Sequence, residues 1–295
     1  MNLEKWEREL RKYASKYFHV LRASTVILFI VFISIVLDIS GCEQVSSPDS
    51  IFINPVDTVG NAFVAPITTI IAGPSDGQTI TTDSVTFKWS GNNARNLFSY
   101  KYDTIQWTPF GTQTSLTLDY LDEGTHTFSV RSLHFNGTTI ETNPPYVQYT
   151  VNAVNGPSLM FYPRRLIVAN GQAFTYDINV VEVSLVYGAK LVMSYDPSLV
   201  NVTGAIVGSP LNTGGSGVML PTIDPVSKTI TLDIAAIGRT PKGIDGTGAI
   251  VVLQCTALAT GVELFQFNAA QTALRDTSNS PIPINTLIGG RVEIQ

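Results

Sequence analysis

Apolar and polar residues alternate in short runs along most of the chain after residue 66. In SVTFKWSG, residues 84–91, every second side chain is apolar, ending with Trp89. A period of two places neighbouring side chains on opposite faces of a β-strand. Clusters of turn-forming residues, such as PSDG, SGNN, DEG, FNG and TNPP, separate these runs. The pattern predicts an all-β protein built from many short strands.

Helical periodicity is missing from the same part of the sequence. After residue 42 no stretch of ten or more residues has an apolar stripe at helical spacing. Doubly wound sheets and TIM barrels need a helix after nearly every strand. The sequence therefore argues against both classes of fold.

The first group of alternating runs covers residues 66–152. In LDEGTHTFSVRSLHFNG a turn at Glu123-Gly124 precedes a strand in which Phe128 and Val130 are expected to face inward, with Ser129 and Arg131 facing outward. This group resembles fibronectin type III and related immunoglobulin-like modules over most of its length. The resemblance implies a sandwich that serves as a spacer or adhesion module and has no chemistry of its own.

The second group covers residues 157–295. In the strand before Tyr195-Asp196-Pro197, Leu191 and Met193 share one face with Tyr195. The run KTITLDIAAIG then alternates in the same way, and a Gly-rich turn in IDGTGAIVVLQCTALATG precedes a long strand. We expect a second sandwich here, with these apolar faces in its core.

The order of these segments resembles the cohesin domain across essentially all of 157–295. The resemblance rests on Tyr195-Asp196-Pro197, Gly246 and Gly248 before the strand 249–258, the turn after Thr260-Gly261, Leu274-Arg275-Asp276, and the terminal Gly290-Arg291-Val292-Glu293-Ile294. It implies a nine-stranded jelly-roll sandwich that is shared with some carbohydrate-binding modules. In cellulosomal members it also implies binding of a dockerin through one sheet face.

Five outward polar residues are the candidates for a partner-binding face: Lys190, Ser194, Thr231, Asp233 and Gln254. Antiparallel sheets often have one face in water, so an ordinary solvated face is the alternative. In many cellulosomal cohesins an acidic or amide residue stands where this chain has Lys190. A flexible point charge does not replace such a group conservatively, so the class of partner stays open.

The N-terminal region combines basic residues with a short apolar run. The run Thr25–Leu37 has thirteen residues, fewer than the roughly 20 that a membrane-spanning helix needs. It is followed by Ile39-Ser40-Gly41-Cys42, which resembles a bacterial lipobox. We therefore expect a signal peptide at 1–41, a lipid on Cys42, a tether over 42–65 and a location in the cell envelope, at the outer membrane or cell surface. An uncleaved signal anchor is the alternative.

Charge and cysteine content narrow the possible partners. Six of the 18 basic and four of the 23 acidic residues precede Cys42, so the remaining chain has a formal net charge of −7. This charge argues against nucleic acid, which binds basic faces.

Cys255 is the only cysteine besides Cys42. It aligns with the inner face of its strand and is expected to be a buried, unreactive thiol.

No residue pattern indicates a metal, a cofactor or catalysis. His126 and His134 have no further ligands at close range in the sequence, and Asp276, Ser278 and Asn279 are typical of an ordinary turn. Motifs of hydrolases, metalloproteases and phosphate-binding loops do not occur. A monomeric, non-catalytic binding protein is expected.

Two kinds of ligand remain open. One is a protein partner, of dockerin type or another type, connected with polysaccharide degradation. The other is a glycan, bound by a carbohydrate-binding or matrix-adhesion lipoprotein. The segment 157–295 contains no tryptophan, and sugar rings usually stack on exposed aromatic side chains. This shortage favours the protein partner.

Overall fold

A computed structural model describes residues 7–14, 16, 56, 58, 63–212, 216–237 and 243–295. Cys42, the lipobox and most of the expected signal peptide and tether lie outside these residues. Residues 7–14 are helical. Within the described part of the chain, no helix combines the length and the apolar character needed to cross a membrane. Contacts divide the chain into two units, 1–64 and 65–295, and every described strand belongs to the second.

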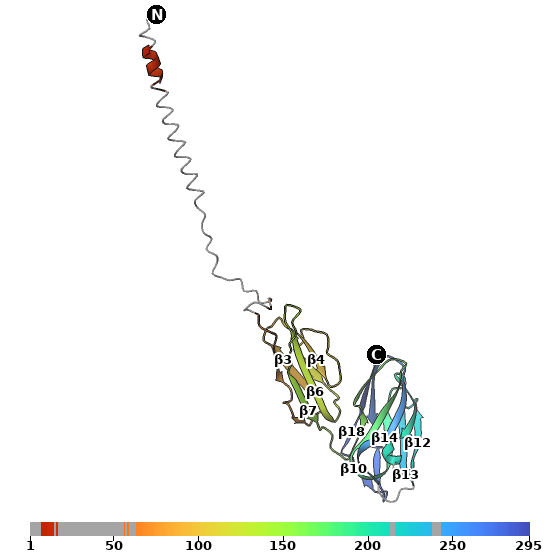
Figure 1. The fold of residues 1–295 in the computed structure, drawn as a ribbon. Helices are drawn as coiled ribbons and strands as arrows, with labels where there is room; N and C mark the ends of the chain where they lie inside the picture. Colours follow the sequence, from red (N-terminus) through yellow and green to blue (C-terminus); the bar gives the residue numbers. More distant parts are fainter. Residues whose placement is uncertain are drawn as a thin grey trace. The chain divides into compact units, whose positions relative to one another are not determined.

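The first seven strands form a three-stranded and a four-stranded sheet (Figure 1). The strand order is β1-β3-β5 in one sheet and β2-β7-β6-β4 in the other. The strands are β1 Thr68–Ala72, β2 Thr79–Ile80, β3 Val85–Gly91, β4 Leu97–Tyr102, β5 Ser115–Leu118, β6 Gly124–Leu133 and β7 Tyr146–Val151.

One aromatic core joins these two sheets. Phe87 and Phe128 stack with ring centroids 3.9 Å apart, and Trp89 lies beside them. The expected inward positions of β3 and β6 are therefore confirmed. Ser129, expected to face water, is buried instead, and its hydroxyl donates to the carbonyl of Pro145. A connecting segment thus covers part of the outer side of β6.

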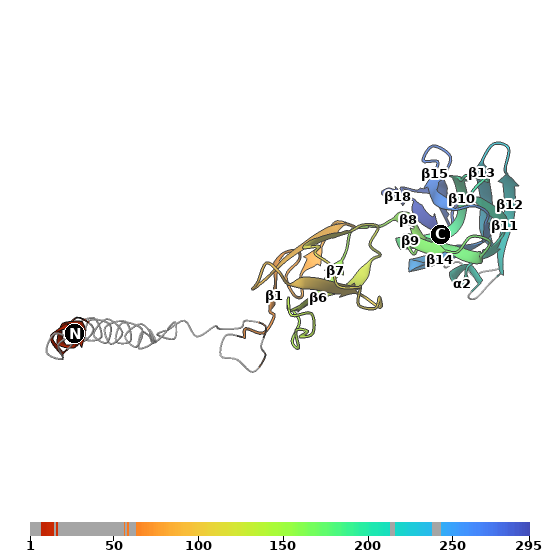
Figure 2. The same ribbon diagram turned by 90° about the horizontal axis from the view of Figure 1, so that it is seen from above.

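Among the described residues, the remaining twelve strands form one hydrogen-bonded network, so the nine strands that the resemblance implied are not confirmed. Two of the twelve have only two or three residues. The strands are β8 Ser158–Tyr162, β9 Arg165–Val168, β10 Ala173–Ser194, β11 Val200–Val207, β12 Ser216–Asp224, β13 Thr229–Ile237, β14 Ile244–Ala257, β15 Gly261–Phe267, β16 Ala273–Asp276, β17 Pro281–Ile282, β18 Thr286–Ile288 and β19 Gly290–Ile294, with a short helix α2 at Ser209–Asn212 (Figure 2).

Strand β10 is the longest element and takes part in two sets of pairings. Its first part pairs with β14 and β8, and its last part pairs with β13, β16 and β15. Between the two parts, Glu182 and Leu185 have φ angles of 48° and 57°. Register shifts accompany these residues, as at β-bulges, which bend a strand and increase its twist. Thr247 and Asp245 accept hydrogen bonds from the backbone N–H groups of Glu182 and Leu185.

The core of this second group lies between the layers that β10 connects. Leu191, Met193, Ile230 and Leu232 are fully buried, together with Phe265. The alternation in KLVMSY and KTITLDI therefore gives the inward face of each strand correctly. Because β10 contributes side chains along its whole length, it also fixes the outer surfaces on both sides of this core.

Candidate partner-binding face

The outward side of β12, β13, the end of β10 and β16 forms one continuous surface, here called the front face. Strand pairing sets its rows of side chains: Leu220, Asp233 and Lys190 are register partners across β12, β13 and β10. The next row contains Val218, Ala235, Gly188 and Arg275. Opposite residues in such rows have Cβ atoms about 5 Å apart, so these side chains form one surface.

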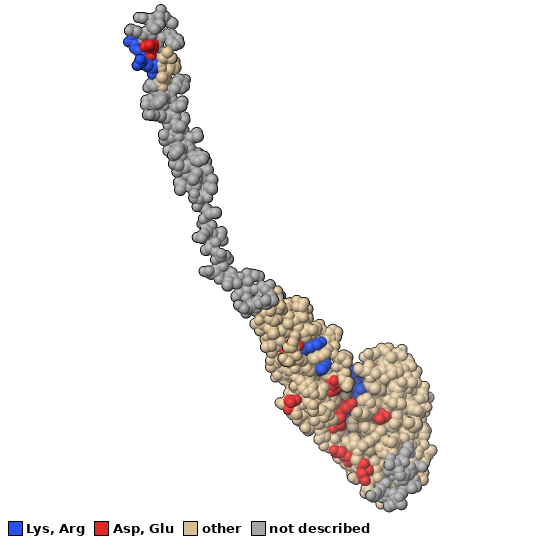
Figure 3. Space-filling model, viewed as in Figure 1, with Lys and Arg blue, Asp and Glu red and all other residues tan. Residues whose placement is uncertain are grey.

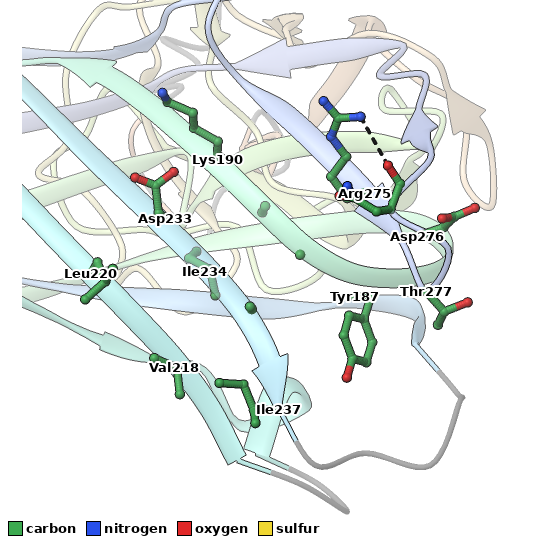
Figure 4. Close-up of a pocket in the computed structure, with 14 residues that line it drawn as sticks. Tyr187, Lys190, Val218, Leu220, Asp233, Ile234, Ile237, Arg275, Asp276 and Thr277 are labelled. Carbon is green, nitrogen blue, oxygen red and sulfur yellow. Dashed lines mark hydrogen bonds between the residues drawn. The ribbon is translucent and has the colours of Figure 1, made fainter.

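A depression of about 510 Å³ lies on the front face (Figure 4). Its apolar side chains include Val218, Leu220 and Ile237, which are 41%, 68% and 53% exposed. Tyr187 and Thr277 lie at one end in Figure 4. Gly188 and Ala235 keep the middle of the rows low, because neither has a side chain larger than a methyl group. The face therefore combines exposed apolar groups with a hollow.

Charged groups lie beside these apolar side chains. Figure 4 shows Lys190 and Asp233 projecting from neighbouring strands. Among the described residues, no salt bridge includes either side chain. The Arg275 guanidinium donates to the carbonyl of Asn279 at 3.3 Å and keeps further donors available. Both signs of charge are thus present at the edge of the depression.

Charged residues make up a small part of this chain. Only 14% of the residues in the chain are Asp, Glu, Lys or Arg. On the side seen in Figure 3, charged side chains are scattered over a largely uncharged surface.

The structure brings four of the five candidate residues together. Lys190 and Ser194 lie on β10, and Thr231 and Asp233 lie on β13, all at outward positions of strands that pair directly. Gln254 does not join them. It lies on β14, opposite Thr175 in the first part of β10, and so belongs to another surface.

Sequence reasoning missed the apolar part of the front face. Val218 and Leu220 in SGVMLPTID are outward, whereas Met219 packs against the core. A run that is apolar at consecutive positions signals a strand with two covered faces. That signal was available in the sequence.

The acidic turn after β16 is satisfied by its own backbone. One oxygen of Asp276 accepts hydrogen bonds from the N–H groups of Ser278 and Ser280, each at 2.8 Å. This is an Asx-type turn. Within the described residues, no group of three or more His, Cys, Asp or Glu side chains could hold a metal ion.

His126 and His134 make contacts that stabilise the fold. His126 Nδ1 lies 2.9 Å from Asp103, and His126 Nε2 lies 2.8 Å from the carbonyl of Asp122. The hydrogen bond with Asp103 raises the pKa of His126. His134 is buried against the ring of Phe135. Both side chains lie in the first group of strands, away from the front-face rows.

Cys255 is buried in the core of the second group, as expected from its register. Burial raises the pKa of its thiol to about 12. The thiolate is the nucleophilic form of cysteine. This residue is therefore a packing element.

Solved cohesin structures are similar to about half of this chain, at low sequence identity. A non-cellulosomal cohesin from Archaeoglobus fulgidus is similar over 47% of this chain and 91% of its own, with 14% identity and a TM-score of 0.38. A type II cohesin domain from the cellulosome of Acetivibrio cellulolyticus is similar over 46% and 94%, with 18% identity and a TM-score of 0.41. A type I cohesin–dockerin complex from Clostridium thermocellum is similar over 47% and 98%, with 13% identity and a TM-score of 0.39.

No family model matches this chain, and no curated protein is significantly similar to it in sequence. The chain is an all-β protein with several sheets.

Proposed function

We propose that this chain is a surface-anchored, non-catalytic adaptor that captures a protein partner on the front face. One observation carries the proposal: Val218, Leu220 and Ile237 are exposed side by side around a depression that Lys190 and Asp233 border. Exposed apolar patches rimmed by polar groups are characteristic of protein-binding sites. Such a patch gives the energy of binding, and the charges around it give orientation and selectivity.

The sequence resemblance to cohesins points to a partner of dockerin type, in the context of polysaccharide degradation. Lys190 gives the site a preference of its own. A partner that places a carboxylate opposite Lys190 and a basic group opposite Asp233 would match both charges. A partner with the reverse arrangement would meet two like-charge contacts and bind more weakly.

The other parts of the chain fit an anchored adaptor. In this proposal Cys42 is lipidated on its sulfur, residues 1–41 are then removed, and residues 42–65 form a tether. Residues 66–152 are an immunoglobulin-like or fibronectin III-like spacer, and residues 157–295 are the binding domain. Two or more acyl chains on one residue would hold the protein at a membrane of the cell envelope. In this proposal the protein is a monomer. No group for covalent catalysis is needed, and the described lining of the depression contains neither His nor Cys.

The test is an affinity capture with the full-length protein from the secreted and envelope proteins of its own organism. The Leu220→Asp variant places a charge in the apolar patch and should lose the captured protein. A second variant, Lys190→Asp with Asp233→Lys, reverses the charge order and should also lose it. Val226→Asp is the matched control, because Val226 is 92% exposed on the turn between β12 and β13 but does not line the depression.

The outcomes separate clearly. Capture of one or a few proteins that the two front-face variants lose and the Val226→Asp variant keeps supports the adaptor. Capture that all variants retain, or no protein capture by the unmodified chain, contradicts it.

A further inference from the structure

Gln254 belongs to a second outer surface that the proposed adaptor function does not use. This surface, here called the back face, is formed by the outward side of β11, β14, β8 and the first part of β10. Its outward residues include Tyr162, Thr175, Asp177, Thr203, Gln254 and Thr256. A shallow depression of about 510 Å³ lies on it, lined in part by Thr175, Thr203, Gln254 and Thr256.

Strand pairing brings these groups close together. Gln254 lies opposite Thr175 on one side and Gly204 on the other. Asp177 lies one row further along β10, opposite Tyr162 of β8. Directly opposite side chains in antiparallel sheets have Cβ atoms about 5 Å apart. An aromatic ring, a carboxyl group, a carboxamide and hydroxyl groups therefore share two neighbouring rows.

Gly204 leaves space for the Gln254 side chain. A Cβ atom at position 204 would lie 3.1 Å from Gln254 Oε1, which is tighter than an ordinary contact. Thr203, its neighbour, has its hydroxyl bonded to the backbone carbonyl of Gln254. The Thr203 hydroxyl thus fixes the backbone of Gln254, whereas the Gln254 carboxamide lies over Gly204, which has no side chain.

The chemistry of the back face differs from that of the front face. The outward positions of β8, β11, β14 and the first part of β10 carry no Lys or Arg. Asp177 is the one acidic residue in the two rows around Gln254, whereas Asp245, also exposed, lies at the start of β14. The Asp177 carboxyl group and the Gln254 carboxamide make no hydrogen bond with other described residues. Burial raises the pKa of Asp177. Two polar groups thus keep unused hydrogen-bonding capacity in rows that contain no basic residue.

The Tyr162 ring supplies the apolar element. It is 43% exposed and lies beside Asp177. Neutral sugars present hydroxyl groups at the edge of the ring and C–H groups on its face. Hydroxyl groups can donate to a carboxylate and exchange hydrogen bonds with a carboxamide, and an aromatic ring can pack against the C–H face.

We propose that the back face binds a neutral polysaccharide. Tyr162 packs against a sugar ring, Asp177 accepts hydrogen bonds from hydroxyl groups, and Gln254 both donates and accepts. The absence of basic groups at these outward positions disfavours acidic glycans, because no group there would compensate their charge. This site is independent of the front face, so the adaptor function can fail while the glycan site stands.

The test is binding of the full-length protein to an array of neutral and acidic polysaccharides, followed by titration with the best neutral chain. Asp177→Ala, Gln254→Ala and Tyr162→Ala should each weaken binding about three- to tenfold, as expected for loss of one good polar or stacking contact. Tyr162→Phe should bind nearly as well as the unmodified chain, because the ring remains. Leu220→Asp on the front face is the matched control and should bind normally.

The thermal unfolding midpoint of each variant identifies any that fails to fold. In that case the comparison of Tyr162→Ala with Tyr162→Phe decides the test. Binding to neutral chains that the back-face variants weaken and the front-face variant keeps establishes the site. The proposal is overturned by no binding to neutral chains, by a preference for acidic chains, or by binding that Asp177→Ala, Gln254→Ala and Tyr162→Ala all retain.

Discussion

The backbone N–H of Asp196 donates to both carboxyl oxygens of Glu263, at 3.1 and 3.0 Å. Asp196 begins the turn after β10, whereas Glu263 lies 67 residues later, on β15, and is 1% exposed. Burial raises the pKa of Glu263 to about 7. A buried acidic side chain thus forms hydrogen bonds with the backbone of the Tyr195-Asp196-Pro197 turn that the sequence analysis identified.

This relationship predicts a specific dependence of stability on pH. Between about pH 4.5 and 7, folded Glu263 keeps its proton and unfolded Glu263 releases it. The folded state therefore binds more protons, and the free energy of unfolding should fall as pH rises through this window. Denaturant unfolding at several pH values should show that Glu263→Gln removes this part of the slope, since a carboxamide does not titrate. An unchanged slope would contradict the assignment to Glu263.

Glu141 joins β1 to β6 in the first group of strands. Its carboxyl oxygens accept from the backbone N–H and hydroxyl groups of both Thr68 and Ser132. Replacing Glu141 with Ala leaves these buried donors without a partner, which should cost on the order of 3 kcal/mol. Urea denaturation measures this loss. Thr117→Ala is the control: it removes one exposed hydrogen bond, to Thr86, and should change stability by well under about 1 kcal/mol.

Gly290 is a position where any side chain would collide with the core. A Cβ atom there would lie 2.0 Å from the hydroxyl oxygen of Tyr176 and 2.7 Å from Cβ of Phe161. Gly290→Ala should therefore lower the free energy of unfolding by about 1–3 kcal/mol or more, as overpacking does. Gly111→Ala should be nearly neutral, because nothing lies within 4 Å of its added Cβ. Equal midpoints of thermal unfolding for the two variants would refute this explanation.

Labelling with a thiol reagent tests both the burial of Cys255 and the lipidation of Cys42. Cys255 is buried and its pKa is raised, so a thiol reagent should not label it in the native protein and should label it after denaturation. If Cys42 is lipidated, protein isolated from the envelope should show no reactive thiol when native and one when denatured. A Cys42→Ser variant should show the same Cys255 behaviour but should carry no lipid. Rapid labelling of the native protein would point to an unmodified Cys42.

Local alternation predicted much of the fold because it depends only on the two-residue period of a strand. Phe87, Trp89, Leu191 and Leu232 all lie in the core as their patterns indicate. The pattern could not give the partners of each strand, since pairing joins residues far apart in the sequence. Gln254 shows the consequence: its outward orientation is correct, but β14 pairs with the first part of β10, so it lies on the back face.

The front face illustrates the same limit. Lys190 and Asp233 could be recognised as outward, but only the pairing of β10 with β13 makes them neighbours. Leu220 was overlooked because an apolar residue on a strand is ordinarily assigned to the core. Its exposure follows from its position opposite Asp233, on the outward side of the sheet.

The length of strand β10 limits where residues can be inserted or deleted in this protein. Since β10 pairs with β8, β13, β14, β15 and β16, one inserted residue in a regular part would turn every following side chain to the opposite side. The front and back faces would then no longer keep their separate chemistries. The bulged segment from Glu182 to Leu185 is already out of regular register, so it is the place where evolution could add or remove a residue and leave both surfaces intact.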